Sequence, residues 1–103
     1  MTEKQFKEIT QWQNKTFPTA TALSSATHLK DEIAELMEAI KLGNRFEINH
    51  EIADCFILLF NIADKCSLSH MSLKAIIDEK MAINYARTWN KPDERGVVKH
   101  VKE

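Results

Sequence analysis

Apolar residues recur every three to four positions along most of the chain, a spacing that predicts amphipathic α-helices. The segment Thr16-Phe17-Pro18 and Gly43 interrupt this pattern, because proline cannot continue a helix and glycine commonly follows a last helical turn. We expect helices over residues 2–15, 21–42, 44–66 and 69–89, with Asn44 or Asn49 as the start of the third. The predicted fold is all-α, an antiparallel helical bundle of about four helices.

The segment after the fourth predicted helix differs from the rest of the chain. Residues 90–103 contain Pro92, Gly96 and many charges. We expect an extended C-terminal tail with ordered contacts through Val97, Val98 and Val101. The whole chain, residues 1–103, is predicted to be one domain, since its length of 103 residues is typical of a single domain.

The third predicted helix is apolar on almost every side. Its apolar residues are Ile52, Ala53, Cys55, Phe56, Ile57, Leu58, Leu59, Phe60, Ile62 and Ala63. A helix of this kind is normally covered all round, and so short a chain has too few other helices to do so. We therefore expect a subunit interface and a homo-oligomer.

Composition and charge exclude several classes of protein. The net charge is −1 and the isoelectric point about 6.4, without the basic excess that is typical of nucleic-acid binders. The polar N-terminus predicts no signal peptide, and no apolar run is long enough for a bilayer. Cys55 and Cys66 would lie about 16 Å apart along one helix, too far for a disulfide. Reduced cysteines favour a cytoplasmic protein.

Two acidic clusters carry the chemistry. Asp31-Glu32-x-x-Glu35 lies on the second predicted helix, and Glu51-x-x-Asp54 opens the third. Carboxylates three residues apart share a helix face, so two such pairs on antiparallel helices could converge. Asp54 begins the apolar helix, where a buried carboxylate would need compensation.

A hard divalent cation would compensate these charges. Glu32, Glu35, Glu51 and Asp54 are the predicted metal ligands, and oxygen-only ligation suits Mg²⁺ or Mn²⁺. The same residues would also be ordinary on a solvated acidic surface, and spacing alone does not decide between the two interpretations. The E-x-x-H run from Glu47 to His50 is typical of di-iron bundles, but it lacks the second copy that such a site needs.

Lys80, Asn84 and Arg87 form one polar stripe on the fourth predicted helix. Two cations and an amide could bind phosphate oxygens, although cations are also favoured near a helix C-terminus for electrostatic reasons. Trp12, Phe17 and Trp89 could stack on a base or could pack in the core. His28 and Asn61, each on the same face as an acidic cluster, are candidates for base or sugar contacts or for structural hydrogen bonds.

The paired acidic motifs resemble those of the MazG-like, all-α NTP pyrophosphohydrolase superfamily. Further residues look like its dATP/dGTP pyrophosphohydrolase (MazZ-like) branch: Trp12-Gln13-x-x-Thr16-Phe17-Pro18, His28-Leu29, Arg87-x-Trp89 and Gly96-Val97-Val98-x-His100-Val101. The likeness covers nearly the whole chain. Asp31 departs from it, since the superfamily usually has glutamate there.

The resemblance implies an enzyme that cleaves a nucleoside triphosphate between its α- and β-phosphates, with Mg²⁺ as cofactor. It also implies a homodimer or homotetramer with its site close to the subunit interface. A purine dNTP, dATP or dGTP, is the expected substrate, with Glu35 or Glu38 as the proton acceptor. The alternatives are a pyrimidine (dCTP/dUTP) pyrophosphohydrolase and a non-enzymatic helical interaction module.

Overall fold

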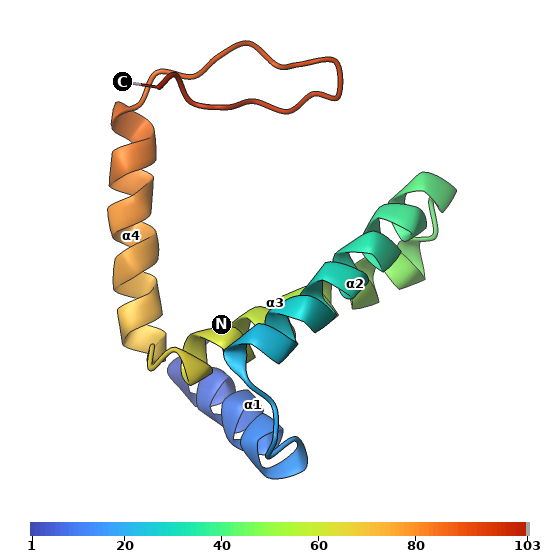
Figure 1. Cartoon of the computed structure of the whole chain (residues 1–103), viewed down its shortest axis with the longest axis vertical. Helices are drawn as coiled ribbons and strands as arrows, with labels where there is room; N and C mark the ends of the chain where they lie inside the picture. Colours follow the sequence, from blue (N-terminus) through green and yellow to red (C-terminus); the bar gives the residue numbers. More distant parts are fainter. Residues whose placement is uncertain (103) are drawn as a thin grey trace. The chain divides into compact units, whose positions relative to one another are not determined.

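The computed structural model describes residues 1–102 and consists of four helices (Figure 1). They are α1 (Glu3–Thr16), α2 (Ala22–Leu42), α3 (Arg45–Lys65) and α4 (His70–Ala86). Within the described residues, β-pairing is limited to an isolated bridge between Trp89 and His100. The prediction of an all-α fold with four helices is confirmed.

Local hydrogen bonds explain where the helices begin. The Thr21 hydroxyl accepts from the Ser24 amide while the Ser24 hydroxyl accepts from the Thr21 amide, which forms a capping box. The Asn44 side chain accepts from the Glu47 amide at 3.2 Å, so Asn44 rather than Asn49 starts α3. Gly43 ends α2 with φ of 66°, a left-handed conformation that glycine adopts without strain.

The chain contains two compact units, Met1–Leu73 and Lys74–Glu103, which are described separately. In the first unit, α2 and α3 form an antiparallel hairpin across the short Gly43-Asn44 turn, and α1 packs against α3 (Figure 1). This arrangement places the two acidic motifs on neighbouring helices.

A small aromatic core holds α1 against α3. Phe6 and Phe60 meet edge to face with ring centroids 5.4 Å apart, and Ala63 is buried beside them. Partly buried Ile9, Leu68 and Leu73 complete the cluster. Such edge-to-face pairs stabilise a fold beyond the apolar area that they bury.

The middle of α3 is much less covered than the pattern predicts. Phe56 is 55% exposed, and Ile52 and Leu59 are also exposed. Within Met1–Leu73, the other helices therefore leave part of α3 uncovered, as their limited size suggests. The predicted subunit interface stays a prediction.

The C-terminal unit shows two differences from expectation. Helix α4 ends at Ala86, three residues before the predicted end. The tail is not fully extended, because it folds back on itself: the Asn90 amide donates to the Lys99 carbonyl at 2.8 Å and the Asp93 amide to the Val97 carbonyl at 2.9 Å. The last residue of the predicted tail, Glu103, lies outside the described residues.

Within residues 1–102, the helices are all too short or too polar to cross a membrane.

Candidate functional site

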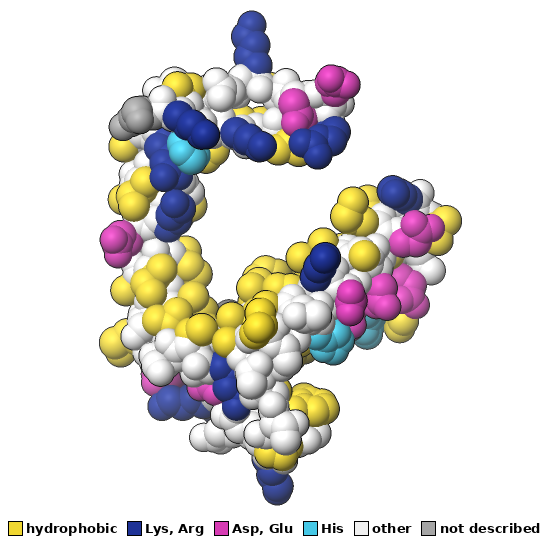
Figure 2. Space-filling model, in the orientation of Figure 1, with side chains coloured by type: hydrophobic (Ala, Val, Ile, Leu, Met, Phe, Trp, Pro, Cys, Tyr) yellow, Lys and Arg dark blue, Asp and Glu magenta, His cyan; other side chains and the backbone are white. Residues whose placement is uncertain are grey.

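Three carboxylates meet where α2 faces the start of α3. Glu32 and Glu35 lie one turn apart on α2, and Glu51 approaches them from α3. One oxygen from each side chain lies within 4.8 Å of the others. Acidic side chains follow the arm formed by α2 and α3 in Figure 2. The antiparallel hairpin thus produces the convergence that the two motifs predict.

The electrostatics of this cluster are unfavourable without a counter-charge. Interaction with the Glu32 carboxylate, followed by burial and by the charges of Glu32 and Glu35, raises the pKa of Glu51 to about 7. The Glu32 carboxylate also raises the pKa of Glu35. The hydrogen bond with Glu51 lowers the pKa of Glu32, which takes the role of the ionised partner. The cluster therefore binds a proton more tightly than isolated glutamates would, and a cation could take the place of that proton.

The Glu51 carboxylate gives the clearest sign of a cation site. Its Oε2 atom is buried and has no hydrogen-bond partner among the described residues. Buried polar atoms are normally paired, so an unpaired carboxylate oxygen facing two other carboxylates fits a hard divalent cation. The donor set consists only of oxygens, which suits Mg²⁺ or Mn²⁺.

Asp54 and Glu38 lie beside the cluster rather than in it. Asp54 is exposed, so the expectation that it is buried at the head of the apolar helix is wrong. It lines a pocket together with Glu32, and its charge contributes to the raised pKa of Glu51. Glu38 lies in a shallow groove with Glu35 and Glu51, on another side of the cluster.

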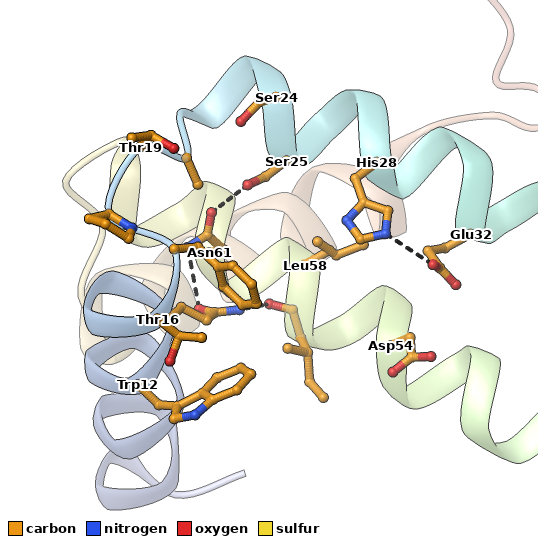
Figure 3. Close-up of a pocket in the computed structure, with 15 residues that line it drawn as sticks. Trp12, Thr16, Thr19, Ser24, Ser25, His28, Glu32, Asp54, Leu58 and Asn61 are labelled. Atoms are coloured by element: carbon orange, nitrogen blue, oxygen red, sulfur yellow. Dashed lines mark hydrogen bonds and ion pairs between the residues drawn. The ribbon is translucent and has the colours of Figure 1, made fainter.

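An elongated pocket of about 730 Å³ lies between α1, the α1–α2 connection, α2 and α3 (Figure 3). Glu32 and Asp54 lie at one end, whereas Trp12, Ser25 and Asn61 lie at the other. Seven helical residues separate Asp54 from Asn61, or about 10 Å along α3. Its volume is in the range usual for small-molecule sites.

Aromatic side chains form part of the wall away from the carboxylates. Trp12 and Phe17 meet edge to face with centroids 5.5 Å apart, and both remain about half exposed. They are therefore poorly covered for core residues and well placed for a flat ligand. Their predicted role in base stacking is consistent with this position.

His28 and Asn61 also line this pocket, in different ways. The His28 ring lies 3.1 Å from Glu32 through its Nε2 atom, which connects the pocket wall to the acidic cluster. Asn61 is almost fully buried and is hydrogen-bonded to Ser25 and Gln13. Sequence reasoning missed Ser25 and gave Gln13 no role, because their partners lie 36 or more residues away.

Lys80, Asn84 and Arg87 belong to the C-terminal unit. The Arg87 guanidinium donates to the Asn84 side-chain oxygen at 3.5 Å, so these two residues share a face. Lys80 is exposed one turn earlier. Trp89, the third aromatic candidate, donates from its indole to the Asn84 carbonyl and is 6.0 Å from the His100 ring.

A solved structure supports this interpretation of the site. The chain is 26% identical to the MazG-like pyrophosphohydrolase of cyanophage S-2L, with a TM-score of 0.79 over 99% of each chain. That structure contains dGDP and three catalytic Mn²⁺ ions per active site. A nucleotide and divalent ions thus occupy a protein with the same fold.

Sequence comparison gives the same relationship. The chain is 36% identical over 95 residues, or 92% of its length, to a dATP/dGTP diphosphohydrolase of Salmonella phage PMBT28. It spans only 30% of that relative's length. Residues 5–103 match the sequence model of the dATP/dGTP pyrophosphohydrolase family, whose members are hydrolases of nucleotide phosphoanhydride bonds. The chain therefore belongs to the dATP/dGTP pyrophosphohydrolase family.

Proposed function

We propose that this protein hydrolyses a purine deoxynucleoside triphosphate between the α- and β-phosphates, giving the monophosphate and pyrophosphate. The observation that carries the proposal is the convergence of three carboxylates, one of which, Glu32, lines one end of the pocket beside Asp54. A nucleotide in the pocket would have its base among the aromatic side chains and its phosphates near the acidic end.

Glu32, Glu35 and Glu51 would hold one or more divalent ions, with Asp54 as a further ligand from the pocket side. Bound Mg²⁺ or Mn²⁺ supplies positive charge that offsets the negative charge on the phosphate oxygens in the transition state. The carboxylates of this chain repel a bare triphosphate, so they serve the reaction only as ligands or proton acceptors.

The remaining side chains orient the substrate and accept a proton. Trp12 and Phe17 would stack on the base, while His28 would hold the Glu32 carboxylate in place from the pocket wall. Glu35 or Glu38 would accept the proton of the attacking water, since both face the groove beside the cluster. For Lys80, Asn84 and Arg87 we propose phosphate binding, a role that their donor groups would support.

The cleavage position can be tested directly. The protein is incubated with dGTP, dATP, dCTP and dTTP, each with Mg²⁺ or Mn²⁺, in ¹⁸O-labelled water. Attack at the α-phosphorus releases pyrophosphate and places ¹⁸O in the monophosphate. Label in the pyrophosphate, or release of orthophosphate alone, would contradict the proposal.

We also propose that the protein is a homodimer or homotetramer, with the exposed α3 side chains Ile52, Phe56 and Leu59 at the interface. Burial of such apolar area commonly drives association. Light scattering coupled to size exclusion would show a mass of two or four chains. A Phe56→Glu variant should shift the mass towards one chain.

A further inference from the structure

The C-terminal unit contains a cavity of its own, about 380 Å³ in volume, between the end of α4 and the returning part of the tail. Its wall is apolar where Ile83, Ala86 and Val101 line it, and polar where Arg87 and His100 do. Among the described residues, no carboxylate lines this cavity. A cation and an imidazole on an apolar wall, with no negative charge beside them, favour an anionic ligand.

Most of the hydrogen-bonding capacity of the Arg87 guanidinium is unused. A guanidinium carries five N–H donors, and within the described residues this one makes a single long bond, of 3.5 Å, to the Asn84 side-chain oxygen. The ion pairs of residues 1–102 do not include Arg87. The side chain is nevertheless partly buried. Because a partly buried guanidinium is normally paired with an acceptor, its spare donors fit an oxyanion such as phosphate.

The fold of the tail brings His100 to the same cavity. The Val101 amide donates to the Thr88 carbonyl at 2.7 Å, next to the bridge that pairs Trp89 with His100. Side chains of such a pair lie on one face, and the two rings meet edge to face with centroids 6.0 Å apart. The Trp89 indole is itself fixed to α4, since it donates to the Asn84 carbonyl at 3.1 Å. The His100 ring is thus held beside the cavity and makes no hydrogen bond to the described residues.

The surroundings of the cavity are basic, although the net charge of the whole chain is −1. From Arg87 to Lys102 there are five Lys or Arg residues and two Asp or Glu residues. One of the two acidic residues, Asp93, is paired with Arg95 at 3.2 Å. Basic side chains gather along the tail in Figure 2. The positive potential of such a segment raises the local concentration of small anions.

We propose that this cavity binds a phosphate group, with His100 as a phosphate-binding residue alongside Arg87. The guanidinium would donate a forked pair of hydrogen bonds to two phosphate oxygens, and the imidazole would donate one from the side of the tail. The phosphate belongs either to the triphosphate of the substrate or to free pyrophosphate, and the two sources share this chemistry. The first source rests on the proposed function, whereas binding of free pyrophosphate does not depend on hydrolysis.

Binding is measured by calorimetric titration of inorganic pyrophosphate into the whole chain in EDTA, where no metal ion at the acidic cluster can contribute. The wild-type protein should bind pyrophosphate, and Arg87→Gln should weaken the affinity by about tenfold or more, as expected for loss of a charge-assisted hydrogen bond. Lys91→Gln removes a charge of the same segment that does not line the cavity, so it should change the affinity by less than about twofold. No binding to the wild-type protein, or equal losses in the two variants, would overturn the inference.

Two substitutions separate phosphate binding by His100 from its packing against Trp89. His100→Gln keeps a side-chain donor and loses the ring, whereas His100→Phe keeps a ring and loses the donor. Phosphate binding predicts that His100→Gln retains the pyrophosphate affinity within about threefold and that His100→Phe loses about tenfold. The reverse order would show that the residue acts only through its ring. In the wild-type protein, NMR signals of the His100 ring should shift during the titration, and their constancy would refute its role even if both variants disturb the tail.

Steady-state kinetics in excess Mg²⁺, with monophosphate release as the readout, identify the source of the phosphate. If the cavity holds the phosphates of the substrate, His100→Phe should raise KM by about tenfold with a small change in kcat, and pyrophosphate should inhibit competitively. If it holds free pyrophosphate, inhibition should be non-competitive and weaker in His100→Phe. A His100→Phe protein with unchanged KM and unchanged inhibition would refute the role of His100. Absence of hydrolysis of every nucleotide would instead refute the proposed function and leave the binding result in EDTA standing.

Discussion

Buried polar atoms are paired at one end of the pocket, whereas the acidic cluster beside the other end has an unpaired one. At one end, Gln13, Ser25 and Asn61 satisfy one another and an acceptor of the backbone. In the acidic cluster, whose Glu32 lines the other end, Glu51 has an unpaired oxygen and two carboxylate neighbours. A satisfied network stabilises the fold, whereas an unsatisfied cluster lowers its stability and is retained where a ligand supplies the missing partner. The contrast separates the part that shapes the pocket from the part that needs a cation.

The strongest test of this contrast is to neutralise Glu51. We expect Glu51→Gln to lower the rate of pyrophosphate release by at least about a hundredfold, because it removes a charged metal ligand. The same change should raise the melting temperature of the metal-free protein, because it removes a repulsive charge. Steady-state kinetics and differential scanning fluorimetry in EDTA measure the two effects.

Glu8→Gln is the matched control for that variant. Glu8 is an exposed carboxylate of α1, 4.0 Å from Lys4, and its loss should alter neither quantity appreciably. A Glu51→Gln protein that melts lower than wild type in EDTA would show that the cluster is not strained.

Substitution in the network of Gln13, Ser25 and Asn61 should lower the stability of the fold, the opposite of the effect expected at Glu51. Asn61→Ala leaves the Gln13 oxygen and the Ser25 hydroxyl without partners, so we expect a loss of about 1–3 kcal/mol in the free energy of unfolding. Asn14→Ala, which removes an exposed hydrogen bond to Asp64, should cost less than about 0.5 kcal/mol. Urea denaturation measures both, and equal losses would contradict the distinction between the two amides.

The aromatic wall should affect binding more than folding. Trp12→Ala should raise KM by about tenfold with a small change in kcat, in line with the contribution of base–aromatic stacking. Because Trp12 is half exposed, the melting temperature should change little. Tyr85→Ala, an exposed aromatic of α4, is the control; an unchanged KM for Trp12→Ala would place the base elsewhere.

The pH dependence of the stability of the metal-free protein is a further test of the repulsion at Glu51. The pKa of Glu51 is raised to about 7 in the fold, from 4.5. The folded state therefore holds its proton more tightly, and metal-free stability should decrease as pH rises from about 4.5 to about 7. The gain in melting temperature from Glu51→Gln should be larger at pH 8 than at pH 5, and a gain independent of pH would refute this.

The smallest expected effect concerns Asp93, a carboxylate whose pKa is lowered rather than raised. Asp93 accepts from the Val97 and Arg95 amides and from the Arg95 guanidinium, and these bonds lower its pKa below 3.8. Its support for the 93–97 turn is present above the unfolded pKa and is lost as pH falls through the lower folded value. NMR shifts of the Val97 amide should report this transition, which Asp93→Asn should abolish.

Periodicity and capping residues determined most of the secondary structure. Asn44, Gly43 and Thr21 act over three or four residues, so the ends of α2 and α3 follow from local sequence alone. The acidic pairs were also readable, since residues three apart on a helix must share a face. The turn in the tail could not be predicted in the same way. It depends on hydrogen bonds from the Arg95 and Val97 amides to the Asp93 carboxylate.

The sequence by itself determined that four helices form and that the two acidic pairs lie on consecutive ones. Tertiary structure alone decided that Glu51 is the strained carboxylate, that Asp54 stays exposed, and that Ser25 and Gln13 meet Asn61. The physical reason is the distance along the chain over which each interaction acts. Helix signals act within one turn, whereas burial and hydrogen bonds between different helices depend on how those helices pack.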